Sequence, residues 1–168
     1  MTEASHKFDW CLEKAKKELL LKKKHCGLIK REPNIEDVRN HIIKAEHNLS
    51  AISYFDKGGF SDWSMSATFY SIYHCFLAVA AKFGYESRNQ DCTIALIKSL
   101  KENKQIELDS IFIEALENYD EQDIQNVVEK REFYTYGTTL SVKDKEEIEK
   151  SIKMCKDCIS QTKKILFQ

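Results

Sequence analysis

DWSMSATFYSIYHCFLAVAAKF, residues 62–83, is the stretch that decides the fold. Its apolar residues recur at helical steps along two sides, Met65, Phe69, Ile72, Phe76 and Ala80 on one and Trp63, Ala67, Tyr70, His74 and Leu77 on the other. A helix that is apolar on two sides must be covered on two sides. We therefore expect a central bundle helix, or one that lies half in the core and half in a subunit interface. Gly84 is expected to end it.

Helical periodicity also organises the flanking sequence. The segment after Pro33 and Asn34 repeats apolar residues at three- and four-residue steps until Gly58-Gly59 stops it. The last helix is expected to begin at Ser141, and its heptad seam runs through Ile148, Ile152, Cys155, Ile159, Thr162 and Leu166. The helices predicted besides the central one cover residues 5–24 (ending near Gly27), 34–57, 91–102, 107–136 and 141 onward, with an interruption near Asp120-Glu121 left open.

The composition agrees with a helical domain. The chain has 168 residues, 42% hydrophobic and 32% charged, with one proline and five glycines. That length suits one core, and so few breakers favour helices over a turn-rich sheet. We predict an all-α, up-and-down bundle of five or six helices. The sequence has no run of about 18 apolar residues, so we expect a cytoplasmic protein without a membrane partner.

The six cysteines are expected to be free thiols, because most lie within helical patterns and the cytosol is reducing. Cys155 and Cys158 have the spacing of a metal or redox pair, but they lie inside the last helix. A zinc site needs four ligands, and no second pair of this kind supplies them. We predict that these cysteines pack as small hydrophobic residues, that no disulfide forms and that no metal or other cofactor is bound.

Charge is spread unevenly along the chain. Residues 1–31 hold nine Lys/Arg against four Asp/Glu, and residues 107–132 hold nine Asp/Glu against two Lys/Arg. The basic run KKELLLKKKH, residues 16–25, is typical of a solvated helix face. Contact with a phosphate backbone and pairing with the acidic segment, within or between chains, both stay open.

The histidines have different expected roles. His41 and His47 lie six residues apart on one helix, so they face different directions and cannot share a metal. Both are predicted to be surface residues. His74 follows Tyr70 by one turn on the second apolar side of the central helix. A core or interface histidine held by a hydrogen bond is favoured there over direct chemistry.

Three stretches carry a resemblance to the HEPN superfamily. SATFYSIYHCFLAVAAKFGYESRNQDC, residues 66–92, resembles the central helix of that family, and KAEHNLSAISYFDKGGFSDWSMSA, residues 44–67, is similar to its second-helix pattern. REFYTYG, residues 131–137, falls where HEPN proteins carry an arginine followed, after four to six residues, by a histidine. The resemblance covers residues 34–168, and the basic residues 1–30 resemble an extension of a small prokaryotic subgroup.

The resemblance implies a helical dimer. Many HEPN proteins are metal-independent ribonucleases whose Arg and His from both subunits meet in a cleft, and others pair with a minimal nucleotidyltransferase in toxin-antitoxin modules. Arg131 matches the motif arginine, whereas Tyr136 occupies the place of the histidine. A phenol is a poor general base at neutral pH, while a guanidinium still binds phosphate and aromatic rings still stack on bases.

The first hypothesis is therefore a homodimer that binds a nucleotide or RNA phosphate through Arg131, Tyr134, His74 and Tyr70, beside a minimal nucleotidyltransferase. The alternatives are an endoribonuclease with Arg131 and Tyr136, or His74, as catalytic residues, and a dimerisation module without a ligand. Independently of the resemblance, Phe133, Tyr134 and Tyr136 could simply close the end of the bundle while Arg131 neutralises Glu129 and Asp123.

Overall fold

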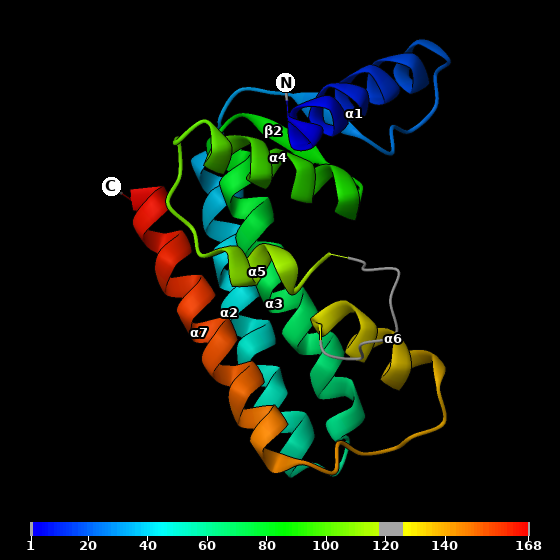
Figure 1. Cartoon of the computed structure of the whole chain (residues 1–168), viewed down its shortest axis with the longest axis vertical. Helices are drawn as coiled ribbons and strands as arrows, with labels where there is room; N and C mark the ends of the chain where they lie inside the picture. Colours follow the sequence, from blue (N-terminus) through cyan, green and yellow to red (C-terminus); the bar gives the residue numbers. More distant parts are fainter. Residues whose placement is uncertain (1, 118–125, 168) are drawn as a thin grey trace.

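The computed structural model describes residues 2–117 and 126–167, and within them it forms an all-α helical bundle with one small sheet (Figure 1). The predicted fold class is confirmed. The helices are α1 (Glu3–Leu20), α2 (Ile35–Lys57), α3 (Ser61–Lys82), α4 (Gln90–Glu102), α5 (Ser110–Glu114), α6 (Val127–Tyr136) and α7 (Lys145–Phe167). The strands are β1 (Leu28–Lys30) and β2 (Tyr85–Ser87).

Helices α2 and α3 form an antiparallel pair around the turn at Gly58 and Gly59. Gly59 has a φ of 82°, a conformation that favours glycine. The hydroxyl of Ser64 donates to the carbonyl of Ile52 at 3.0 Å, and the hydroxyl of Ser71 donates to that of Ala45 at 3.0 Å. These small buried side chains let the two helices approach closely, and each hydrogen bond contributes about 1 kcal/mol. The register of the pair is thereby fixed.

Helix α7 packs along both members of this pair, as Figure 1 shows. Five of its six predicted seam residues are buried and Ile152 is half-buried, so the predicted seam is confirmed. The predicted start at Ser141 is wrong, because the helix begins at Lys145 and the carboxylate of Asp144 accepts a hydrogen bond from the Glu146 amide at 2.9 Å. Cys155 and Cys158 are fully buried, as expected for packing residues.

The single helix predicted over residues 107–136 is also wrong. Helix α5 ends at Glu114 and is followed by a turn, and α6 begins at Val127 behind the cap Asn126, whose side chain accepts from the Glu129 amide at 2.8 Å. The interruption left open at Asp120-Glu121 lies outside the described residues. Because α6 is a separate helix, it can lie against α3.

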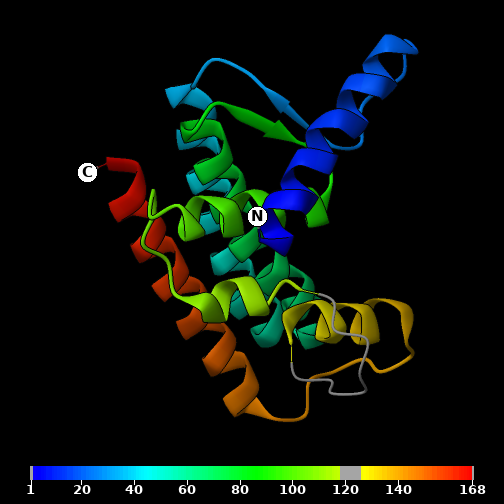
Figure 2. The same ribbon diagram turned by 45° about the horizontal axis from the view of Figure 1, so that its top comes forward.

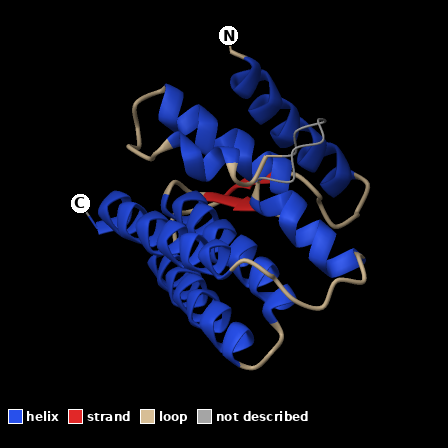
Figure 3. Ribbon diagram, turned by 60° about the horizontal axis from the view of Figure 1, so that its bottom comes forward, coloured by secondary structure: helices blue, strands red, loops and turns tan. Residues whose placement is uncertain are grey.

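The N-terminal helix lies at one end of the molecule and packs against α4 (Figure 2). It ends at Leu20, earlier than the predicted boundary and well before Gly27. Strands β1 and β2, which were not predicted, pair antiparallel at the end of the molecule where α1 and α4 lie (Figures 2 and 3). The division into an extension, residues 1–30, and a bundle, residues 34–168, stays a prediction.

A disulfide joins α1 to α4, and this overturns the expectation that every cysteine is a free thiol. Cys11 and Cys92 are bonded, with their Cα atoms 5.7 Å apart and both side chains fully buried. The sequence pattern could not indicate this pair, because the two residues are 81 positions apart. Cys26, Cys75, Cys155 and Cys158 are free, and Cys26 is the exposed one.

Candidate ligand-binding face on helices α2, α3 and α6

The second apolar side of α3 is only partly covered within the chain. Ala67 is buried and His74 and Leu77 are half-buried, but Trp63 is 51% exposed and Tyr70 is 46% exposed. Contacts from α2 and α6 flank this strip. His41 of α2 contacts His74, and Thr135 of α6 lies 3.1 Å from Ser66, hydroxyl to hydroxyl. We call Trp63, Tyr70, His74 and Leu77 the α3 strip.

Arg131 approaches α3 from α6. Its guanidinium carbon lies 4.0 Å from the centre of the Phe69 ring, and its side chain is only 20% exposed. A guanidinium over an aromatic face is held by the ring quadrupole. Its one ion pair among the described residues is to Glu132, at 3.3 Å. The expected neutralisation by Glu129 is not seen, and Asp123 lies outside the described residues.

Phe69 brings Arg131 and Tyr70 to the same place. The Tyr70 ring meets the Phe69 ring edge-on, with the centroids 5.0 Å apart, while Tyr73 stacks on Phe69 at 5.6 Å. The Tyr73 hydroxyl lies 3.2 Å from that of Thr93 on α4. Burial raises the pKa of Tyr73, and the hydrogen bond with Thr93 opposes that rise. The arginine is therefore supported by a packed aromatic cluster and not by a flexible loop.

His74 meets a partner that the sequence did not predict. Its Nδ1 lies 3.0 Å from the Nδ1 of His41 on α2. The prediction of His41 as a surface residue is wrong, because that side chain is half-buried, whereas His47 is exposed as expected. His41 and His74 are almost equally far along the sequence from the turn at Gly58, and such positions lie side by side in an antiparallel helix pair. The sequence could therefore have indicated this contact. The expectation that His74 is held by a hydrogen bond is confirmed.

The two tyrosines of α6 have different surroundings. Tyr134 packs against the core, and burial, together with the nearby Glu147 carboxylate, raises its pKa. Tyr136 is 82% exposed. Helix α6 continues through Tyr136 and does not unwind ahead of Gly137, so Arg131 and Tyr136 point to different sides of the helix. The structure brings Arg131 and Tyr70 together and leaves Tyr136 apart from them.

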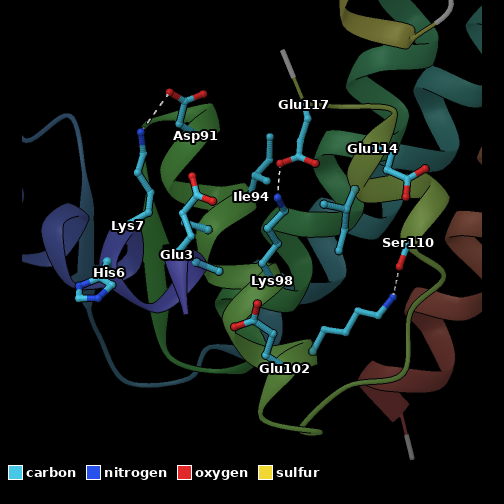
Figure 4. Close-up of a pocket in the computed structure, with 14 residues that line it drawn as sticks. Glu3, His6, Lys7, Asp91, Ile94, Lys98, Glu102, Ser110, Glu114 and Glu117 are labelled. Carbon is cyan, nitrogen blue, oxygen red and sulfur yellow. Dashed lines mark hydrogen bonds and ion pairs between the residues drawn. The ribbon is translucent and has the colours of Figure 1, made fainter. Parts of the chain in front are cut away.

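A separate groove of about 1140 Å³ lies between α1, α4 and α5 (Figure 4). Its floor includes Ile94, and its rim carries both signs of charge. Two ion pairs cross the groove, Lys98 with Glu117 and Lys7 with Asp91 at 3.7 Å, and Lys101 donates to Ser110 at 2.6 Å. The groove includes none of the predicted site residues, so it is not the face predicted from the sequence.

No cluster of three or more His, Cys, Asp or Glu side chains suited to a metal occurs in the described parts of the chain. None of the helices there combines the length and the low charge that a bilayer crossing requires.

The fold and this face define a class of protein: a small all-α bundle that presents one arginine, backed by aromatic rings, beside a partly exposed strip of its central helix. The family model of the HEPN domain matches residues 38–166, and the chain belongs to the HEPN family. The match covers α2 to α7 nearly completely and leaves α1 outside it. Comparison with curated proteins gives no match, and neither does comparison with solved structures.

Proposed function

We propose that this HEPN protein is a homodimer that binds the phosphate of a nucleotide or an RNA with Arg131, in a cleft formed when two α3 strips meet. Membership of the HEPN family is consistent with a role related to nucleotides or RNA. The proposal also includes a cytoplasmic location and a minimal nucleotidyltransferase partner in a toxin-antitoxin module. The resemblance to HEPN proteins motivates these last two elements.

The stacking of Arg131 on Phe69 carries the proposal. A ring occupies the flat face of a guanidinium, but the N–H groups point outward in its plane, where they can form paired hydrogen bonds to a phosphate. Glu132 engages one of these nitrogens at 3.3 Å, a long contact, and leaves the others for a ligand. Stacking also orders the Arg131 side chain before a ligand binds, so binding costs less side-chain conformational entropy.

The exposed rings beside Arg131 support the other parts of the proposal. Tyr70 shares the Phe69 ring with Arg131 and is nearly half exposed, so it is placed to stack on a base. Trp63 and Phe60, 51% and 59% exposed, extend the uncovered aromatic surface toward the α2–α3 turn. Aromatic residues are enriched at protein interfaces, so this end of α3 suits a second subunit.

Binding of labelled RNA and of ATP to wild type, Arg131→Ala and Arg131→Lys tests the proposal. We expect Arg131→Ala to weaken binding about 10-fold or more, because a charged hydrogen bond contributes about 1.5–3 kcal/mol. Arg131→Lys should keep only part of the wild-type affinity, since an ammonium cannot form two parallel hydrogen bonds to a phosphate. Arg39→Ala, at an exposed position of α2, is the charge-matched control. Equal affinities for wild type and Arg131→Ala would remove Arg131 from the site.

A second candidate is a metal-independent endoribonuclease, and one observation favours it. His74, the residue of the α3 strip one turn beyond Tyr70, is hydrogen-bonded to His41 of α2, so two imidazoles lie together beside the proposed cleft. Incubation of the dimer with single-stranded RNA and a chelator tests this activity. Intact RNA after incubation with a large excess of enzyme would exclude it. A dimer that binds neither RNA nor ATP would leave the third hypothesis, a dimerisation module.

A further inference from the structure

The His41 and His74 side chains meet between α2 and α3, in a contact that phosphate binding by Arg131 does not itself require. Their Nδ1 atoms are 3.0 Å apart, their ring centroids are 5.2 Å apart, and the rings are inclined by 35°. A hydrogen bond between two Nδ1 atoms needs a proton on one and a lone pair on the other. The two nitrogens therefore point at each other across one shared proton.

The surroundings keep both rings neutral. Burial, together with the electrostatic effects of His41 and Lys44, lowers the pKa of His74 to about 4. Burial also lowers the pKa of His41, an effect that Asp37 partly opposes. Two neutral imidazoles at physiological pH can each offer a lone pair, and this is the form of histidine that binds metal ions.

We propose that His41 and His74 together bind a divalent transition-metal ion, such as Zn²⁺, Ni²⁺ or Cu²⁺, through their Nδ1 atoms. The ion takes the place of the shared proton, and the donor ring carries its proton on Nε2 instead, so both imidazoles stay neutral. Metal–imidazole bonds are about 2.0–2.1 Å long, so two nitrogens on one ion at an angle of about 90–110° lie about 2.8–3.4 Å apart. The observed 3.0 Å lies within this range, and both rings must turn so that their lone pairs leave the N–N line and converge on the ion.

The remaining coordination positions fall to solvent. The described residues include no third ligand close enough to complete a cluster of three, so the protein supplies two ligands. In the single chain both rings are half-buried beside the exposed Tyr70, so water can reach an ion there before a second subunit covers this face. Two charges act on such an ion with opposite sign, because Asp37 attracts a cation and Lys44 repels it. This inference does not depend on phosphate binding by Arg131.

Titration of tag-free full-length protein with Ni²⁺ and Zn²⁺ by calorimetry tests the site. His41→Ala and His74→Ala should each weaken binding about 10-fold or more, since even outer-shell partners of a metal contribute 10–100-fold. His47→Ala is the matched control, because His47 is an exposed histidine on the same helix, and it should bind like wild type. Unchanged binding in His74→Ala, or an equal loss in His47→Ala, would reduce the pair to a structural hydrogen bond.

Two further variants test the site without removing a ligand, and so without risk to the helix contact. Lys44→Gln should tighten Ni²⁺ binding, and Asp37→Asn should weaken it. The Cu²⁺ complex of wild type should show coupling to two nitrogen nuclei in its electron paramagnetic resonance spectrum. If both charge variants bind like wild type and the spectrum shows no coupling to imidazole nitrogen, the inference fails. An RNA titration in parallel distinguishes this failure from that of the Arg131 site.

Discussion

The guanidinium of Arg131 lies 4.0 Å from the centre of the Phe69 ring, so a helix of the second half of the bundle is joined to the central helix by a cation–π contact. Phe69 is only 2% exposed, and Tyr70 and Tyr73 pack on the same ring. An arginine on a solvated helix would sample many rotamers. Here the buried ring beneath it sets the position of its guanidinium.

Phe69→Leu tests whether RNA affinity depends on the position of the Arg131 guanidinium and not only on its charge. The variant keeps Arg131 but removes the ring, so a cation–π contact of about 0.5–2 kcal/mol is lost. We expect RNA affinity to fall toward that of Arg131→Ala while the helix content stays that of wild type, as measured by titration and circular dichroism. Ile72→Leu, a swap at another buried position of α3, is the control. Wild-type affinity in Phe69→Leu would contradict a positioning role.

Reduction of the Cys11–Cys92 bond should destabilise the protein. A disulfide constrains the unfolded chain, and a native bond typically contributes about 2–4 kcal/mol to the free energy of unfolding. Urea unfolding with and without a reductant should show this difference in wild type and none in a Cys11→Ser/Cys92→Ser double variant. Cys26→Ser, which removes an exposed thiol, should unfold like wild type in both conditions. Coincident wild-type curves would mean that the bond does not stabilise the fold.

Acid should weaken the fold through His74. Its pKa is about 4 in the folded state against about 6.5 when unfolded, so between these values the unfolded chain binds more protons. The contribution is complete above pH 6.5 and is lost as the pH falls toward 4. After a discount for partial exposure, we expect about 1–2 kcal/mol.

The comparison of wild type with His74→Gln isolates this effect from the carboxylates, which titrate in the same range. The loss of unfolding free energy between pH 7 and pH 4.5 should be smaller in the variant. Identical losses of unfolding free energy in wild type and His74→Gln would show that protonation of His74 does not destabilise the folded state.

The buried thiols should resist alkylation. Burial raises the pKa of Cys155 to about 12 and that of Cys158 well above its usual range, and the thiolate is the reactive form. With iodoacetamide under native conditions, we expect rapid labelling of Cys26 alone, and labelling of Cys75, Cys155 and Cys158 only after denaturation. Mass spectrometry counts the adducts, and fast labelling of Cys158 would show that α7 separates readily from α3.

The long helices could be predicted from sequence because they are amphipathic and have clear end signals. Asn34 caps α2 as expected, and its side chain accepts from the amides of Glu36 and Asp37. Gly84 follows α3 with a φ of 75°. The short elements could not be predicted in this way, since each strand has three residues and α5 has five, and neither length shows a period.

The candidate site could be predicted only in part, because some of its residues are recognisable only by their tertiary contacts. Arg131, Tyr70 and His74 carry a recognisable chemistry in the sequence, but the partners Phe69 and His41 act only through tertiary contacts. Phe69 looks like an ordinary core residue, and His41 looks like a surface one. The Cys11–Cys92 bond is the extreme case, because it joins an N-terminal helix to a helix in the middle of the chain.

That bond has a practical consequence for anyone who trims the chain to its family boundaries. A fragment starting at Val38 would lose α1 and β1 together, leaving β2 without a neighbour and Cys92 as an unpaired thiol on a newly wetted surface of α4. Such a fragment would contain the whole region that matches the HEPN model, and we expect it to aggregate. The Cys11–Cys92 bond and the β1–β2 pair thus tie residues that precede the matched region to the residues within it.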